Sequence, residues 1–71
     1  MVLRIRLERI AREIPSYRFA QLLEIDHQMW SQYERGTRPP PVAILSQVSE
    51  LLGLPADDLF TVVEVAPVHH G

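Results

Sequence analysis

The stretch FAQLLEIDHQMWSQYERG, residues 19 to 36, predicts two short helices joined by a tight turn. Asp26 precedes the second helix and is expected to cap it by accepting a hydrogen bond from the backbone N–H of Met29; its charge also suits the positive end of the helix dipole. Gly36 follows the last helical residue, where the backbone commonly takes a positive φ that glycine adopts without strain. The second helix is therefore expected between Asp26 and Gly36.

The second helix divides its side chains between two faces. At about 100° per residue, Met29, Trp30 and Tyr33 share an apolar arc. The opposite arc is polar and contains no acidic residue: His27, Gln28, Ser31, Gln32 and Arg35. A glutamine carboxamide can pair with N6 and N7 of adenine, so this face suits base edges in the major groove of DNA. An ordinary solvated helix face is the alternative interpretation, but the surrounding pattern favours a helix-turn-helix.

Several residues around this stretch carry a family resemblance. Ala20, Leu23 and Ile25 are followed by YERGTRPP at residues 33 to 40 and by PVAILSQVSELLGLPADDLF at residues 41 to 60. In order and spacing these resemble the Cro/phage-repressor type (XRE-like) helix-turn-helix proteins over about residues 3 to 60. The resemblance implies an all-α fold, a compact five-helix domain like that of the Cro and C1 repressors at residues 1 to 60, with a short C-terminal strand or tail at residues 61 to 71.

The resemblance also implies roles for individual residues. The family touches base edges with positions that correspond here to His27, Gln28 and Gln32. Phosphate contacts are expected from the start of the preceding helix, from the second helix and from the loop after it: Ser16, Tyr17, Arg18, Ser31, Arg35, Thr37 and Arg38. Arg9 and Glu34 match the positions of an ion pair that is common between the first helix and the second helix of the motif.

Three residues depart from the family pattern. Glu24 occupies a turn position where glycine is usual, so a positive φ there would carry strain. Trp30 replaces the usual isoleucine or valine, which requires either room in the core or a partly exposed ring. Pro15 stands where a polar residue usually starts the helix, and Ser16 is expected to cap in its place.

The remaining helices are expected on either side of the motif. The first runs from about Leu3 to Glu13, with ion pairs Arg4–Glu8, Glu8–Arg12 and Arg9–Glu13 and the apolar stripe Leu3, Leu7, Ile10 and Ile14. Another begins near Pro41 and ends at Gly53, with the core stripe Val42, Leu45, Val48 and Leu52. A last helical turn returns Leu59 and Phe60 to the core.

The charges are unevenly distributed along the 71 residues, although the net charge is only −2. Residues 1 to 40 hold all seven basic residues, each an arginine, against five acidic ones, a net charge of +2. Residues 41 to 71 hold four acidic residues and no basic one, a net charge of −4. The basic half contains the polar helix face, which would orient the domain on a phosphate backbone while keeping non-specific binding weak.

The C-terminal residues change character. Thr61, Val62, Val63 and Val65 are β-branched and precede Pro67, a pattern that predicts a short strand. A lone strand leaves its edges unpaired, so we expect the same strand of a second copy as its partner, in a homodimer held by Val62, Val63 and Val65. A disordered tail is the alternative. A two-fold dimer would read a palindromic operator.

These observations predict a small transcriptional regulator, a repressor that binds double-stranded DNA, and not an enzyme. The three glycines lie apart and form no phosphate-binding loop, and His27 has no accompanying catalytic residues. We predict no cofactor and no metal site, since His69 and His70 are adjacent and poorly placed to share an ion. The absence of cysteine, signal peptide and membrane segment predicts a cytoplasmic, nucleoid-associated protein.

A different class of function fits the same fold. The acidic C-terminal half, Trp30 and the β-branched tail are also typical of a protein-interaction module, such as the antitoxin partner of a toxin or an accessory subunit. The polar side chains His27, Gln28 and Gln32 distinguish the two hypotheses, because only DNA reading requires them.

Overall fold

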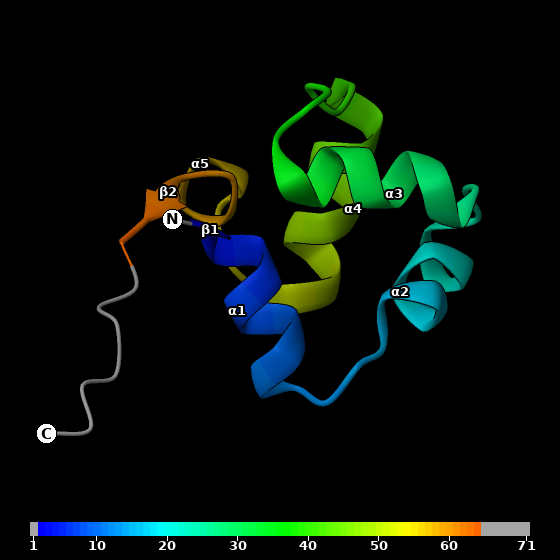
Figure 1. Ribbon diagram of the computed structural model, residues 1–71, viewed down its shortest axis with the longest axis horizontal. Coiled ribbons are helices and arrows are strands. Elements are labelled where there is room, and N and C mark those ends of the chain that lie inside the picture. The colour runs from blue at the N-terminus through cyan, green and yellow to red at the C-terminus, as the bar shows by residue number, and fades with distance from the viewer. Residues whose placement is uncertain (1, 65–71) are drawn as a thin grey trace, which may run out of the picture.

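A computed structural model describes residues 2 to 64 of the chain. In this part of the chain five helices follow one another between two short strands that lie together (Figure 1). The elements are β1 (Val2–Leu3), α1 (Arg4–Ala11), α2 (Ser16–Leu23), α3 (His27–Arg35), α4 (Val42–Leu52), α5 (Ala56–Leu59) and β2 (Val62–Val63). The prediction of five helices and a short C-terminal strand is confirmed.

The two strands form an antiparallel ribbon. Val2 lies opposite Val63 and Leu3 opposite Val62, and the backbone N–H of Arg4 donates to the carbonyl of Thr61 over 2.9 Å. The expectation that β2 has no partner within its own chain was therefore wrong, because the N-terminal residues supply one. Leu3 belongs to the ribbon and not to the first helix, while Val65 lies outside the described residues.

The core is built around one aromatic pair. The Phe19 and Trp30 rings lie 4.7 Å apart between centroids, tilted by 31°, and both residues are fully buried. Ile5, Val48 and Leu59 bring α1, α4 and α5 to the same core. The substitution of tryptophan in α3 is therefore accommodated inside the core, although the buried Nε1 of Trp30 has no hydrogen-bond partner within residues 2 to 64.

Helix α1 departs from its predicted apolar stripe. It buries Ile5 and Arg9, whereas 37% of Leu7 and 51% of Ile10 are exposed. Leu7 lies about 200° around the helix from Ile5 and therefore on the opposite side. The predicted Arg9–Glu13 pair is not formed, because Arg9 turns inward to Glu34; the two pairs of Glu8 with Arg4 and Arg12 are present.

Helix α4 presents a core stripe displaced from the predicted one at its start. Ile44, Val48 and Leu52 are buried, Leu45 is half-buried, and 77% of Val42 is exposed. Val42 is the first helical residue after Pro41 and faces solvent. At the other end, Gly53 terminates the helix with a φ of +69°, as predicted.

The turn between α2 and α3 has the strained residue that the sequence suggested. Glu24 has a φ of +57°, in the left-handed region that favours glycine. Its backbone N–H donates to the carbonyl of Gln21, and that of Ile25 to the carbonyl of Ala20, so the turn is hydrogen-bonded despite the side chain. The first turn of α2 differs from expectation: Pro15 is the N-cap, and Ser16 is already helical and does not cap.

Candidate nucleic-acid interface

The ends of α3 are fixed by local contacts. The Asp26 carboxylate accepts a hydrogen bond of 3.0 Å from the backbone N–H of Gln28, one residue earlier than the predicted donor, Met29. Gly36 closes the helix with a φ of +78°. The Asp26 cap and the left-handed Gly36 thus define a nine-residue helix. Its first turn, with His27 and Gln28, contains no acidic side chain.

The two predicted faces of α3 are present. Trp30 and Tyr33 are buried in the core with Glu34 beside them. The polar face of α3 points away from the core and lines a shallow groove with five side chains: His27, Gln28, Ser31, Gln32 and Arg35. The first two and the last are exposed, and the middle two are half-buried. Hydrogen-bonding groups from three successive turns thus share one accessible surface.

A buried ion pair holds α3 against α1. The Arg9 guanidinium approaches the Glu34 carboxylate to 2.7 Å, with its Nε 3.2 Å from both oxygens, and the side chains are only 11% and 7% exposed. The remaining amino group of Arg9 donates to the backbone carbonyl of Ile14 over 2.7 Å. Because one guanidinium satisfies both acceptors, the ion pair links α1, the segment before α2 and the last turn of α3.

A second contact joins the starts of α2 and α3. The Nε2 atom of His27 lies 3.1 Å from the Ser16 hydroxyl, so a residue predicted to touch phosphate is hydrogen-bonded to one predicted to touch a base. Tyr17 is more than half exposed, and the exposed Arg18 bonds to Gln21 over 3.3 Å. The first turn of α2 therefore stands beside the polar face of α3.

The loop after α3 is folded back onto that helix. The backbone N–H groups of Thr37 and Arg38 and the Thr37 hydroxyl all donate to the carbonyl of Gln32, at 3.0 to 3.3 Å. The exposed Arg38 guanidinium lies 2.9 Å from the sulfur of Met29. Residues predicted to contact phosphate thus lie at both ends of α3: Ser16 beside His27 at its start, and Thr37 and Arg38 beside Gln32 near its end.

The sequence-based site omitted one residue. Arg6 of α1 lines a groove together with Ser16, Ser31 and Arg35, three of the predicted phosphate contacts. Arg6 precedes Arg9 by three positions, so one helical turn places both toward the same neighbours. That spacing is visible in the sequence, but only the folded structure shows that Arg6 lines the same groove as the predicted phosphate contacts.

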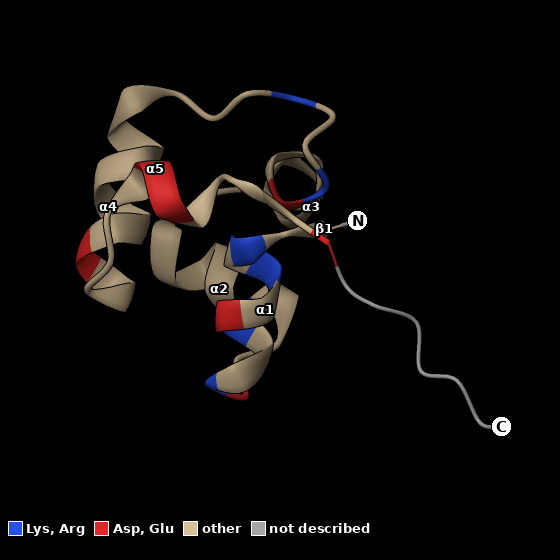
Figure 2. Cartoon of the chain, turned by 90° about the vertical axis from the view of Figure 1, so that its left-hand side faces the viewer, with Lys and Arg blue, Asp and Glu red and all other residues tan. Residues whose placement is uncertain are grey.

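Three of the four acidic residues of the C-terminal half lie on other helices, and Glu64 follows β2. Glu50 is in α4, and Asp57 and Asp58 are in α5, whereas the arginines of α1 and α3 lie on those helices together with Glu8 and Glu34 (Figure 2). Within residues 2 to 64, no group of three or more histidine, cysteine, aspartate or glutamate side chains is placed to hold a metal ion; His69 and His70 lie outside this range. None of the helices there has the length and apolarity needed to cross a membrane.

A core-packed α2, a tight turn and an α3 with an exposed polar face define a helix-turn-helix domain of the DNA-binding type. The helix-turn-helix family HTH_3 matches residues 5–59, and the chain belongs to this family of Cro/C1-type (XRE) helix-turn-helix proteins. It is thus a DNA-binding transcription regulator by family, and the family's domain is not an enzymatic one. Among curated proteins, none gives a significant match to the chain.

Proposed function

We propose that the protein is a repressor that recognises a specific sequence of double-stranded DNA with α3 in the major groove. The observation that carries this proposal is the polar face of α3, because its accessible groups are two amides, one hydroxyl, an imidazole and a guanidinium, while the one acidic residue of the helix, Glu34, is buried against Arg9. Such a surface meets the donors and acceptors of base edges without repelling phosphate.

In this proposal the two glutamines read bases. Gln28 is exposed in the first turn of α3 and Gln32 is half-buried one turn later, which suits contacts with neighbouring base pairs. His27 joins them at the start of the helix. Ser16, Tyr17 and Arg18 would contact phosphates on one side, and Thr37 and Arg38 on the other, with Ser31 and Arg35 on the flank of α3. These phosphate contacts set the register, and the base contacts set the specificity.

We further propose a homodimer that reads a palindromic operator. Val62 of β2 is 58% exposed, and β2 pairs with β1 along one edge only within residues 2 to 64. A second copy can add to the other edge, with Val62, Val63 and Val65 at the contact. Val62→Lys should abolish the dimer in sedimentation experiments, because it would bring a charged side chain of each copy into the contact. A variant that remained dimeric would contradict this part of the proposal.

The test of DNA recognition is selection of binding sites from a randomised duplex pool at about 150 mM salt, where non-specific phosphate binding is suppressed. We expect an enriched inverted repeat, whose half-site spacing follows from the dimer. No enrichment by a well-folded protein would contradict the proposal.

One observation favours a second candidate function, a protein-interaction module such as an antitoxin or an accessory subunit. Leu22 of α2 and Leu51 of α4 are 43% and 45% exposed and line a shallow groove on the surface. Exposed leucines in one place are typical of a contact with another protein. Under this function, replacement of Gln28 and Gln32 would leave partner binding unchanged, whereas Leu22→Ser and Leu51→Ser would weaken it.

A further inference from the structure

A groove between three helices lies beside the polar face of α3. We name it the α1–α3 groove; Arg6 enters it from α1, Ser16 from the start of α2, and His27, Ser31 and Arg35 from α3, with the buried Arg9–Glu34 pair completing its lining. Its volume is about 240 Å³. The groove therefore has room for one phosphate group.

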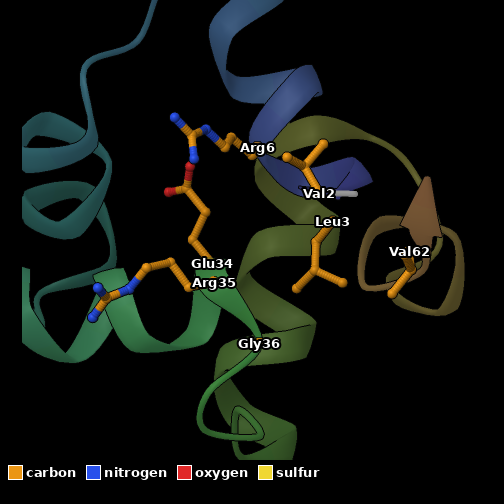
Figure 3. Close-up of a pocket in the computed structure, with 7 residues that line it drawn as sticks. All are labelled: Val2, Leu3, Arg6, Glu34, Arg35, Gly36 and Val62. Atoms are coloured by element: carbon orange, nitrogen blue, oxygen red, sulfur yellow. The ribbon is translucent and has the colours of Figure 1, made fainter. Parts of the chain in front are cut away.

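The charges in this groove are predominantly positive. Glu34 and Arg9 neutralise each other at 2.7 Å, which leaves the two exposed guanidinium groups of Arg6 and Arg35. Figure 3 shows both side chains extending away from Leu3 and Val62, with the Glu34 side chain between them. Arg6 forms no ion pair with any of the residues 2 to 64. Two guanidinium groups with spare donors thus share one groove.

The groove also contains the hydroxyl groups of Ser16 and Ser31, and the start of α2 adjoins it. Ser16 is the first residue of α2, whose N-cap is Pro15 and makes no side-chain hydrogen bond to the first turn. The N–H groups of that turn have no acceptor within the helix, and they lie at the positive end of its dipole. The Ser16 hydroxyl bonds to His27, which connects these donors to the first turn of α3. An anion in the groove would therefore meet donors from α1, α2 and α3.

From this arrangement we infer that the α1–α3 groove binds a phosphate of the DNA backbone and that Arg6 is a DNA contact from α1, outside the helix-turn-helix motif. The inference rests on the proposed DNA-binding function. It gives α1 a role beyond packing, because a phosphate held by Arg6 and Arg35 would anchor the edge of the polar face of α3. DNA is the occupant that fits, since the groove adjoins the side chains proposed to read bases.

The test compares Arg6→Gln with Arg4→Gln in the full chain. Both substitutions remove one arginine charge from α1, but Arg4 pairs with Glu8 and does not line the groove. Duplex affinity is measured between about 50 and 300 mM salt, with circular dichroism as the check on folding. For Arg6→Gln we expect about tenfold weaker binding and a salt slope smaller by about 0.9, the value for one phosphate contact. Arg6→Lys should recover most of the slope, whereas Arg4→Gln should retain it fully.

A second measurement locates the phosphate. Neutral methylphosphonate linkages replace the phosphates of the duplex one at a time. At one position per half-site the wild type should lose affinity, and Arg6→Gln should lose less there than the wild type does, because only Arg35 then remains to meet that phosphate. Equal salt slopes for Arg6→Gln and Arg4→Gln, while the wild type still binds DNA, would overturn the inference but not the proposed function. Failure of the wild type to bind any duplex would overturn both.

Discussion

Helices α1 and α3 are joined by a buried ion pair but divide their side chains in opposite ways. α3 buries Trp30 and Tyr33 and exposes a polar face, as an amphipathic helix does. α1 fully buries only Ile5 and Arg9, and it leaves Leu7 and Ile10 partly exposed. The two helices meet through Arg9 and Glu34. The difference shows that a charged pair can set the rotation of a helix against its apolar pattern.

The physical reason is that partial exposure of an apolar side chain costs less free energy than a buried charge without its partner. Leaving Ile10 half-exposed forfeits part of a hydrophobic contribution of about 2 kcal/mol. Leaving one member of a buried ion pair without its partner is worse, at about 3 to 5 kcal/mol. Glu34 is buried on α3. The orientation of α1 in which Arg9 faces Glu34 is therefore the most stable one, even though Leu7 and Ile10 then turn partly toward solvent.

The largest effect is expected from breaking this pair. Glu34→Ala leaves the Arg9 guanidinium buried with only the Ile14 carbonyl as acceptor, so the free energy of unfolding should fall by about 3 kcal/mol. Urea denaturation monitored by circular dichroism measures it. The double variant Arg9→Met with Glu34→Leu should recover more than half of the loss; a single variant within about 1 kcal/mol of wild type would contradict the role given to the pair.

Trp30 tests the apolar side of α3. Trp30→Leu should lower the free energy of unfolding by about 3 kcal/mol through the cavity it leaves. Trp30→Phe should cost much less, about 1 kcal/mol, because the lost volume is offset by removal of the buried Nε1 donor that has no partner within residues 2 to 64. Thermal unfolding of the two variants side by side is the measurement. Equal losses would indicate that the indole donor is satisfied after all.

The partly exposed side of α1 should tolerate substitution better than its buried side. Leu7→Ser and Ile10→Ser should each lower the free energy of unfolding by only about 1 kcal/mol, because the side chains are 37% and 51% exposed and only their buried part contributes. Ile5→Ser on the same helix is the matched control and should be strongly destabilising, since Ile5 is fully buried. Losses above about 2 kcal/mol for Leu7→Ser or Ile10→Ser would show that α1 is rotated from the described position.

The smallest effect concerns pH and the surface of α1. Hydrogen bonds from Arg12 and Arg4 lower the pKa of Glu8 below its ordinary value of 4.5. The folded state therefore favours the ionised carboxylate, and this stabilisation is complete above the unfolded pKa and is lost as the pH falls through the lower folded pKa. Unfolding curves between pH 6 and the acid range should show a slightly shallower decline for Glu8→Gln than for wild type; identical curves would mean that the surface pairs contribute nothing.

The sequence predicted α3 well because its determinants are local. Asp26, Gly36 and the 3.6-residue spacing of Trp30 and Tyr33 specify its ends and faces without reference to the rest of the chain. The ribbon and the rotation of α1 could not be predicted in this way. Val2 pairs with Val63 across the whole domain, and Arg9 with Glu34 across 25 residues, so the local pattern of α1 pointed to the wrong face.

In the candidate site, too, the features set by local sequence were predicted and those set by long-range contacts were not. Its polar face follows from helical spacing, whereas the phosphate contacts at the ends of α3 come from the family resemblance and stay a prediction. Arg6 was missed because the sequence does not show that this residue of α1 lines a groove together with residues of α2 and α3. A single sequence records which residues share a helix face, but not which other helix that face will meet.

The central claim is that the polar face of α3 reads bases, while α1 supports it. Gln28→Ala combined with Gln32→Ala tests this most directly, by affinity for a selected duplex and for a randomised one together with urea denaturation. We predict that the preference for the selected duplex falls by about 1 to 3 kcal/mol for each lost bidentate contact, with the free energy of unfolding unchanged. An undiminished preference in a folded double variant would contradict the claim.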